Sequence, residues 1–411
     1  MKAHLEINNL ENETFLKVAG SKSISNRILI LQALSDSNEL IENISDAKDT
    51  LVLREALKSN GENIDVGDAG TAFRFLTSYY CLNANKIILT GSTRMKQRPI
   101  KDLVNALRLL GADIEYLEQE GFPPLKIQAS LLKGGELPIY SCISSQFISS
   151  LLMIAPFLKN GLDLHLIGSI ISAPYIQMTL ELMNYHGIKS SWKENLIKVF
   201  PGEYIHRPFQ VESDWSSISY LFETIALSDN GKIYIEKVDL KSIQGDKKVC
   251  ELFTSFGVIY SIENCTLCIY KDDSFTKPSF LEFDCSSCPD LAQTIAATAS
   301  GLGIHTKIKG LSNLPFKETD RLKSIKQELE KTGVKVKIEG QKSLEIFPSE
   351  SFFPSEIIFE SHGDHRMAMS LAPLALKIKS IWIENAQVVI KSYPNYWEDL
   401  KRLSFKVNLF K

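Results

Sequence analysis

The amino-acid sequence predicts an α/β protein of two lobes, each built from repeats of one unit. Three observations predict this fold class. The chain has 411 residues, more than a single hydrophobic core usually serves. Polar segments lead into apolar helices at six places, and in the first five a second helix ends at a glycine before a strand-like run. The interval from helix start to glycine stays between 39 and 43 residues, and so constant an interval is typical of an internal repeat.

Each repeat opens with a segment rich in serine, aspartate, glycine or arginine. We expect the six buried helices to begin near Lys22, Gly70, Ser145, Trp215, Asp290 and Asp364. The closing glycines are Gly61, Gly111, Gly187, Gly257 and Gly333. Glycine there fits the left-handed residue that ends many helices. The alternation that follows, as in residues 334–338, predicts half-buried strands. The sequence therefore predicts six copies of a unit in which one helix is buried and another covers a sheet.

Six repeats over two lobes give three repeats per lobe. The midpoint falls between the strand run near Val211 and the helix start at Asp214. We expect a strand between His4 and Val18 to close a sheet of the lobe that follows this midpoint. One lobe would then hold residues 1–19 and 213–411, and the other residues 20–212, with crossings near 19–20 and 212–213. Two crossings beside a cleft can act as a hinge.

Composition excludes several classes of protein. The net charge of -3 gives no basic field of the kind that binds nucleic acid. The longest apolar runs, residues 28–34 and 151–158, are much shorter than the roughly 18 residues that cross a bilayer. Residues 1–13 lack the pattern of a signal peptide. We therefore expect a cytoplasmic protein with no nucleic-acid or membrane partner.

The cysteines allow two interpretations. Cys265 with Cys268, and Cys285 with Cys288, have the spacing of a zinc ribbon. However, residues 262–270 are predicted to form one strand, where residues three apart point to opposite faces. We therefore favour free thiols, buried or partly buried, over structural zinc.

The helix starts carry the candidate chemistry. The segment Gly20–Arg27 predicts a helix N-terminus suited to an anion, with Ser23 and Arg27 on one face. Similar residues occur at the other starts and in the loops 91–99 and 313–321: Gly70, Thr71, Arg74, Arg94, Arg98, Ser144, Ser145, Gln146, Asp290, Lys317, Glu318, Arg321, Asp364, His365 and Arg366. So many cations suit a substrate with several phosphates or carboxylates.

Single residues in this set remain ambiguous at the level of sequence. For Arg98 alone, we favour a surface salt bridge. Asp290 and Glu318 could pair with arginines or move protons. His365 could carry a proton or hydrogen-bond at a helix start. No Walker loop, Rossmann glycine motif or serine elbow occurs in the chain.

In this order, the motifs resemble the enolpyruvyl transferase family, in particular the branch whose acceptor is shikimate 3-phosphate. They are Gly20–Arg27, Asp68–Arg74, Arg94–Pro99, Ser144–Phe147, Lys317–Arg321 and Asp364–Met369. The resemblance implies two lobes of three βαβαββ units, whose buried helices point their N-termini at the cleft. It implies transfer of enolpyruvyl from phosphoenolpyruvate to the 5-hydroxyl of shikimate 3-phosphate, in aromatic amino acid biosynthesis. It further implies a monomer with no metal or organic cofactor.

The resemblance also implies roles for single residues. Shikimate 3-phosphate would contact Lys22, Ser23, Arg27, Ser144, Ser145, Gln146, Ser172, Asp290, Asn313 and Lys317. Phosphoenolpyruvate would contact Lys22, Gly70, Arg94, Gln146, Arg321, Arg366 and Lys391. Asp290, Glu318 and Lys22 would handle protons, with Asp290 nearest the attacking hydroxyl.

Two positions depart from the pattern of the family: Asp68 stands where asparagine is common, and Phe75 where proline is common. We therefore expect inhibition by glyphosate, which competes with phosphoenolpyruvate, to differ from that of typical members. Comparison with Phe75→Pro tests this expectation.

Two alternatives stay open. The sister enzyme that acts on UDP-N-acetylglucosamine carries an asparagine at the position of Ser23 and a cysteine in the loop 91–99, and this chain has neither. The second alternative is an inactive, anion-binding homologue on the same fold.

Overall fold

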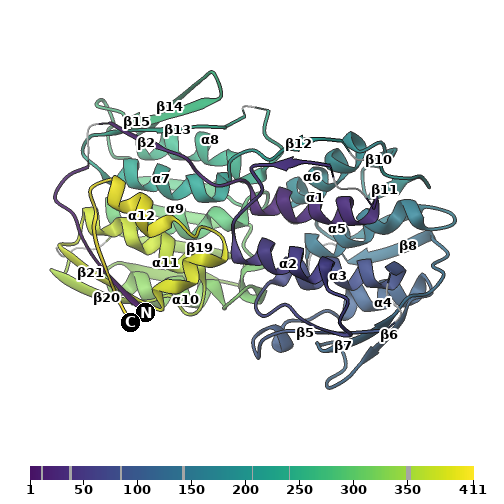
Figure 1. The fold of residues 1–411 in the computed structure, drawn as a ribbon. Coiled ribbons are helices and arrows are strands. Elements are labelled where there is room, and N and C mark those ends of the chain that lie inside the picture. Colours follow the sequence, from purple (N-terminus) through teal and green to yellow (C-terminus); the bar gives the residue numbers. More distant parts are fainter. Residues whose placement is uncertain are drawn as a thin grey trace. The chain divides into compact units, whose positions relative to one another are not determined.

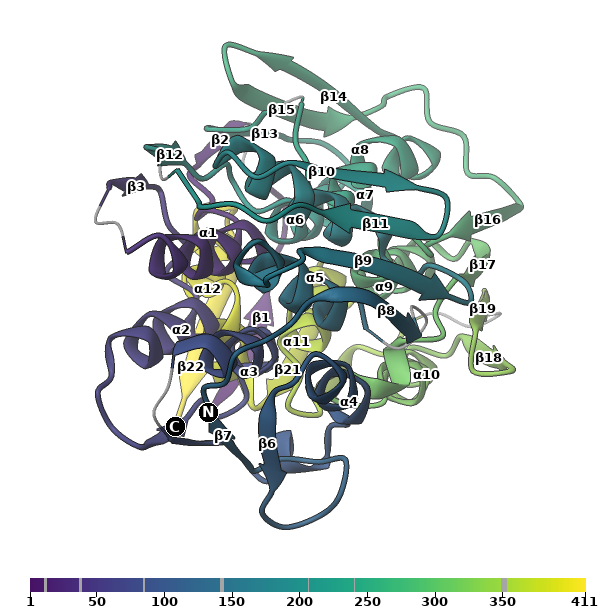
Figure 2. The same ribbon diagram turned by 90° about the vertical axis from the view of Figure 1, so that its right-hand side faces the viewer.

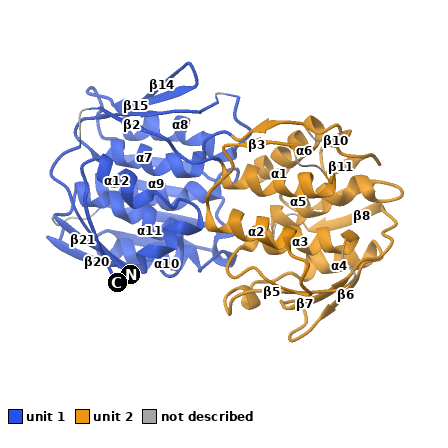
Figure 3. Ribbon diagram, in the orientation of Figure 1, with its two compact units in different colours: residues 1–20, 212–411 blue, residues 21–211 orange. Residues whose placement is uncertain are grey.

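The chain folds into two structural units. The computed structural model describes residues 1–10, 13–36, 39–83, 86–140, 144–205, 207–239, 241–348 and 353–411. The chain divides into unit 1, residues 1–20 and 212–411, and unit 2, residues 21–211 (Figure 3). Each boundary differs by one residue from the boundary expected from the sequence.

Unit 2 contains two repeats with four-stranded sheets. The first comprises β4 (Asn63–Asp65), α3 (Gly70–Asn83), β5 (Ile87–Thr90), α4 (Lys101–Leu109), β6 (Asp113–Tyr116) and β7 (Leu125–Gln128). The second comprises β8 (Gly135–Tyr140), α5 (Ser145–Ile154), β9 (Leu162–Ile167), α6 (Ala173–Tyr185), β10 (Ser190–Lys193) and β11 (Leu196–Val199). The sheet orders are β4-β5-β7-β6 and β10-β11-β9-β8. Figure 2 shows the strands of the second sheet lying side by side.

The remaining repeat of unit 2 is shorter. It comprises α1 (Lys22–Leu34), β3 (Ile41–Glu42), α2 (Lys48–Lys58) and β12 (Phe209–Gln210). Among the described residues, its sheet holds the parallel pair β12 and β3 alone. After α2 the chain passes directly into β4 of the next repeat, so no hairpin completes this sheet.

Unit 1 contains three repeats. The first comprises β2 (Glu13–Leu16), α7 (Trp215–Leu227), β13 (Lys232–Ile235), α8 (Val249–Leu252), β14 (Val258–Glu263) and β15 (Thr266–Lys271). The second comprises β16 (Phe280–Asp284), α9 (Ala292–Leu302), β17 (His305–Lys309), α10 (Arg321–Glu330), β18 (Lys335–Glu339) and β19 (Ser343–Phe347). The third comprises β20 (Glu356–Glu360), α11 (His365–Leu371), β21 (Ser380–Glu384), α12 (Tyr396–Arg402), β22 (Lys406–Phe410) and β1 (Lys2–Glu6).

In all five four-stranded sheets, the first two strands of the repeat pair in parallel and the other two pair antiparallel. The antiparallel pair is a hairpin in four of these sheets, whereas in the sheet of β20 and β21 it joins β22 to β1, from the two ends of the chain. The single strand expected over residues 4–18 is wrong. The segment forms two strands, and these close two different sheets of unit 1: β1 pairs with β21 and β22, and β2 with β13.

Three helices form the centre of each unit. In unit 1, α7, α9 and α11 run side by side (Figure 1), and nearly every residue of α7 and α9 is buried. Their hydrophobic faces require the sheets as cover, because a helix that is apolar on all sides is stable only in an interior. In unit 2, α1, α3 and α5 are the equivalent buried helices.

Four of the five closing glycines adopt the expected left-handed conformation, with φ between 75° and 104°: Gly111, Gly187, Gly257 and Gly333. Gly61 is the exception, because α2 ends at Lys58 and the extended Ser59 turns the chain. The strand expected over residues 262–270 is also wrong. It is interrupted by a hairpin turn at Asn264 and Cys265, both with positive φ, as in a type I′ turn.

That turn leaves the thiol of Cys265 exposed, against the expectation that the thiols are at least partly buried. Cys268 is half-buried, and Cys285 and Cys288 are buried. Cys81 and Cys250 are also buried, and Cys142 lies outside the described residues. Within the described ranges, no helix is long and apolar enough to cross a membrane.

Candidate functional site

The starts of three helices of unit 1 meet at the Asp290 carboxylate. Asp290 lies in a 3-10 turn, residues 289–291, directly before α9. One of its oxygens accepts from Arg321 Nη1 at 2.8 Å, and the other from Arg366 Nη2 at 3.0 Å. Lys317 Nζ lies 3.5 Å from the same carboxylate. The sequence expectation that these helix starts share one site is therefore correct within this unit.

The charge state of Asp290 follows from these neighbours. Burial alone disfavours the charged form, but Arg366, Lys317 and Arg321 outweigh it and hold the pKa of the Asp290 carboxyl well below its usual range. Burial also lowers the pKa of Lys317, and Asp290 partly offsets that shift. Asp290 is therefore ionised at neutral pH and can accept a hydrogen bond.

Arg321 is the centre of the cluster. It is the first residue of α10, it is 1% exposed, and three carboxylates surround it. Nε donates to Asp364 at 2.6 Å, and Nη2 donates to Glu318 at 3.0 Å, beside the bond to Asp290. Burial would lower the pKa of Arg321, but these carboxylates raise it above its ordinary value. Such a charge needs all its partners, because a buried unpaired charge is very costly.

Glu318 connects the cluster to a second cation. Its other oxygen accepts from Lys391 Nζ at 3.1 Å, and Lys391 is buried at the end of a 3-10 helix, residues 386–391. Asn313 is buried at the start of another 3-10 helix, residues 314–316, which precedes Lys317. His365 is buried beside Asp364, with Nδ1 3.7 Å from the carboxylate.

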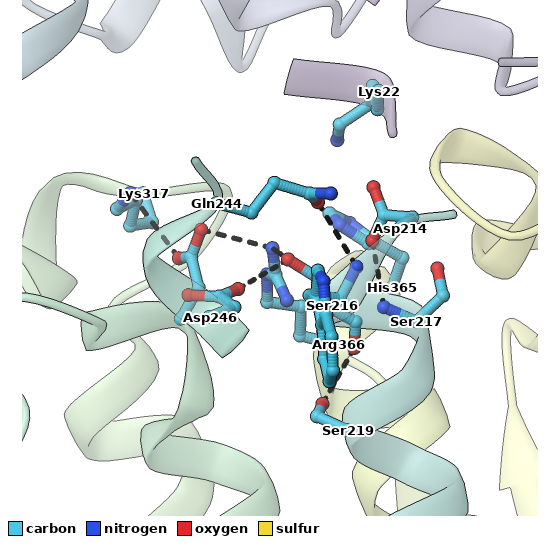
Figure 4. Close-up of polar contacts among 12 residues, drawn as sticks. Lys22, Asp214, Ser216, Ser217, Ser219, Gln244, Asp246, Lys317, His365 and Arg366 are labelled. Atoms are coloured by element: carbon cyan, nitrogen blue, oxygen red, sulfur yellow. Dashed lines mark hydrogen bonds and ion pairs between the residues drawn. The ribbon is translucent and has the colours of Figure 1, made fainter. Parts of the chain in front are cut away.

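Three residues that sequence reasoning missed hold Arg366. The Arg366 guanidinium donates to the Ser216 hydroxyl at 3.2 Å and to the Tyr220 hydroxyl at 3.4 Å. Ser216 in turn donates to Asp246, and both lie beside Arg366 in Figure 4. Burial raises the pKa of Asp246 to about 6, and Arg366 opposes this shift. The segment 214–220 was recognised as a helix start, but its side chains carried no signal of contact with Arg366.

Unit 2 holds a separate cluster around Arg27. Its guanidinium is buried on α1 and donates to four oxygens: Thr179 Oγ1 at 2.7 Å, the Ser23 carbonyl at 2.8 Å, and Ser149 Oγ and the Tyr175 carbonyl at 3.1 Å. Burial lowers the pKa of Arg27 to about 10. All four acceptors are neutral hydroxyl or carbonyl oxygens. Among the described residues the Arg27 charge is therefore hydrogen-bonded but not paired with a carboxylate, which favours an anionic ligand.

The other residues assigned to this cluster lie at the starts of α5 and α6. Ser144 is the N-cap of α5, and its hydroxyl accepts from the Gln146 N–H at 3.3 Å. Gln146 donates through Nε2 to Thr71 on α3 at 3.0 Å. Ser172 precedes α6 in a left-handed conformation, with φ of 60°. Lys22 pairs with Asp49, a partner that the sequence did not indicate, at 3.5 Å.

The guanidinium beside Gly70 belongs to Arg98. A Cβ added to Gly70 would clash with Arg98 Nη1 and lie 3.0 Å from Cζ. Arg98 is 7% exposed, so the surface salt bridge expected for it is wrong. Among the described residues, Arg98 forms no ion pair, and its Nε lacks a hydrogen-bond partner. Arg94 is exposed, with Nη1 3.5 Å from Gln97.

The two departures from the pattern lie in different surroundings. The Asp68 carboxylate accepts from the Ser92 hydroxyl. Phe75 is buried on α3 and lies under the Arg27 guanidinium, with Cζ 5.4 Å from the ring centre. Phe75 therefore contacts the cluster around Arg27, in addition to its place on the helix that begins at Gly70. Among the described residues, no group of three or more His, Cys, Asp or Glu side chains could hold a metal ion.

Fold and site together define a class. The protein is a two-unit α/β enzyme with buried clusters of cations at the starts of its helices, suited to substrates that carry phosphate and carboxylate groups.

Comparison with known proteins narrows this class to one family. The family model for EPSP synthase (3-phosphoshikimate 1-carboxyvinyltransferase) matches residues 7–65 and 53–400. The 3-phosphoshikimate 1-carboxyvinyltransferase of Bacteroides fragilis is 42% identical over 96% of each chain. That of Mannheimia haemolytica is 36% identical over 97% of this chain and 98% of its own. The structure of EPSP synthase from Acinetobacter baumannii superposes on this one over 100% of both chains, with a TM-score of 0.78 and 19% sequence identity, and therefore has the same fold. The chain belongs to the EPSP synthase family.

Proposed function

We propose that the protein transfers the enolpyruvyl group of phosphoenolpyruvate to the 5-hydroxyl of shikimate 3-phosphate and releases phosphate. The family and the curated relatives support this activity. The observation that carries it in this chain is the ionised Asp290 carboxylate held by Arg321, Arg366 and Lys317. It combines a group that can accept a proton with cations that can stabilise developing negative charge.

The cluster around Arg27 is the proposed site for the phosphate of the acceptor. An uncompensated, buried guanidinium with serine hydroxyls nearby suits a phosphate dianion. We assign this role to Ser23, Arg27, Ser144, Ser145, Gln146 and Ser172, while Asp290, Asn313 and Lys317 contact the rest of the acceptor.

Phosphoenolpyruvate is proposed to bind the remaining cations. Arg94 keeps the role expected for it, and Arg98 joins it in this assignment, because Arg98 is the buried guanidinium at the N-terminus of α3. Gly70 lets that guanidinium approach the helix start. The other groups are Lys22, Gln146, Arg321, Arg366 and Lys391. Arg321 must exchange one of its three carboxylate partners for the carboxylate of the substrate.

The chemistry follows from the charge states. A proton is added to the methylene carbon of phosphoenolpyruvate, and the acceptor oxygen forms a bond to C2, which gives a tetrahedral intermediate. The C2–O bond to phosphate then breaks, and a methyl proton is lost to restore the double bond. Because Asp290 is ionised, it does not supply the proton to carbon. It accepts a hydrogen bond from the attacking hydroxyl and takes the proton as the bond to C2 forms, when that proton has become strongly acidic. Lys22 is the proposed proton donor, and Glu318, between Arg321 and Lys391, is the third proton-handling group.

Phosphate release from purified protein tests the proposal. We expect release that requires both phosphoenolpyruvate and shikimate 3-phosphate, and no release when UDP-N-acetylglucosamine is the acceptor. Asp290→Asn should lower kcat by about a thousandfold, the middle of the range for a catalytic acid or base. Asp229→Asn is the matched control, because that carboxylate is 91% exposed and pairs with Lys377 at the surface. No release with both substrates present would refute the proposed activity.

A monomeric state and a cytoplasmic location are proposals that rest on the sequence expectations. Light scattering of the purified protein tests the first.

A further inference from the structure

A second contact between α10 and the segment before α11 lies two helical turns from the site. Arg321 and Glu328 are seven residues apart on α10, so they share one face and are separated by about 10 Å along the axis. Arg321 pairs with Asp364, and Glu328 contacts residues 360 and 362 of the same segment. The helix is therefore attached to this segment at two points.

The Glu328 carboxylate is completely buried and has three partners. Oε1 accepts from His362 Nε2 at 2.8 Å, and Oε2 accepts from the Glu360 N–H at 2.9 Å and from Lys331 Nζ at 2.5 Å. Lys331 also donates to the Ile358 carbonyl at 2.9 Å, within β20. Each of these contacts matters for the position of the segment, because loss of any one partner leaves the buried charge of Glu328 incompletely compensated.

The segment that Glu328 holds is a strained turn. His362 and Gly363 both have positive φ, of 52° and 69°, and the Asp364 N–H donates back to the Ser361 carbonyl at 2.9 Å. A residue other than glycine in the left-handed region is unfavourable and persists where surrounding contacts impose it. Two contacts hold His362 here: Nε2 hydrogen-bonds to Glu328 at 2.8 Å, and the backbone N–H donates to Glu360 Oε1 at 3.1 Å.

The turn leads directly into the site. Asp364, the next residue, caps α11 by accepting from the Arg366 N–H at 2.8 Å, and it binds Arg321 at 2.6 Å. Arg366 then reaches Asp290 at 3.0 Å. A change in the turn at His362 therefore displaces both Asp364 and Arg366.

We propose that Glu328 and His362 are positioning residues, which fix the turn 361–364 and so place Arg366 for the anionic substrate. The inference rests on the proposed function for its kinetic consequence but not for its structural one. It predicts that removal of the hydrogen bond between Glu328 and His362 raises the KM for phosphoenolpyruvate by a larger factor than it lowers kcat.

The test compares Glu328→Gln, His362→Ala and His362→Gln. Glutamine at 362 retains an N–H donor, whereas alanine does not. Glu330→Gln is the matched control on the same helix, because Glu330 pairs with Lys326 and accepts from the Val336 N–H at the start of β18. Hydrogen–deuterium exchange of residues 358–369 provides a readout that does not depend on activity.

We expect faster exchange of this segment in Glu328→Gln and His362→Ala, and near-normal exchange in His362→Gln and Glu330→Gln. In Glu328→Gln and His362→Ala, the KM for phosphoenolpyruvate should rise about tenfold, the change expected for loss of one hydrogen bond to a charged group, and kcat should fall by a smaller factor. If Glu328→Gln does not fold, His362→Ala carries the test, because that side chain is 20% exposed.

Exchange and KM like those of the wild type in His362→Ala would overturn the inference. Equal effects in His362→Gln and His362→Ala would also overturn it, because the hydrogen bond would then not matter. Absence of turnover in the wild type refutes the proposed function instead, while the exchange experiment still tests the pair.

Discussion

Substitution of Gly70 by alanine tests the proposed position of Arg98. The added Cβ would clash with Nη1 and lie 3.0 Å from Cζ and 3.1 Å from Nη2. All three atoms belong to one guanidinium, so the whole group must move away from the helix start. If Arg98 binds the carboxylate of phosphoenolpyruvate, the substitution weakens one hydrogen-bonded charge pair, worth about 1.5–3 kcal/mol. That corresponds to an increase in KM for phosphoenolpyruvate of about 10- to 150-fold.

Steady-state phosphate release at varied phosphoenolpyruvate measures this effect. The KM for shikimate 3-phosphate should change little, because the contacts of Arg27 lie on α1, α5 and α6. Gly202→Ala is the control: its Cβ would meet Ile188 Cδ1 at 3.5 Å, an ordinary contact. An unchanged KM for phosphoenolpyruvate in Gly70→Ala would refute the assignment of Arg98.

Three further predictions concern buried groups. Neither carboxyl oxygen of Glu223 has a hydrogen-bond partner among the described residues, and burial raises its pKa well above the usual value of 4.5. The folded protein thus keeps a proton that the unfolded chain loses, and the free energy of unfolding falls as pH rises from 4.5 towards the folded pKa, by about 1.4 kcal/mol per pH unit. Urea unfolding of Glu223→Gln should lack this slope, and an identical slope in both proteins would contradict the assignment. Arg27→Lys should raise the KM for shikimate 3-phosphate at least tenfold, because lysine cannot donate along the four directions of the guanidinium; an unchanged KM would refute the phosphate site. Phe75→Leu removes a cation–π contact to Arg27 worth about 0.5–2 kcal/mol, so isothermal titration should show weaker binding of shikimate 3-phosphate. Unchanged binding of shikimate 3-phosphate together with altered inhibition by glyphosate would contradict this, and would indicate that Phe75 acts on the site for phosphoenolpyruvate instead.

The sequence predicted the fold well because its signals are local and repeated. Serine, aspartate and glycine at helix starts report on capping, which depends on a few neighbouring residues. Ser21, Ser144, Asp214 and Asp364 cap their helices through their own side chains. The short sheet of β12 and β3 was not predictable, because strands of two residues carry no alternation that could be recognised.

The site was predictable only in part, for a different reason. Asp290, Arg321 and Arg366 lie in polar motifs, and the structure brings them together. The burial of Arg98 beside Gly70 was not predicted, because it depends on which side chain turns inward next to a 3-10 helix, residues 95–97, and sequence context does not distinguish two arginines of one loop in this respect. Asp246, Asp49 and Glu328 act through contacts with distant segments, so spacing along the chain gives no sign of them.

Turnover in deuterium oxide tests the central claim most directly. Addition of a solvent proton to the methylene carbon creates a methyl group, which then loses one hydrogen as phosphate leaves. Mass spectrometry of the quenched mixture should therefore show shikimate 3-phosphate enlarged by one enolpyruvyl group, with deuterium on its vinyl carbon, and phosphate in equal amount. Phosphate release without an enolpyruvyl product, or a product free of deuterium, would contradict the proposed transfer through a tetrahedral intermediate.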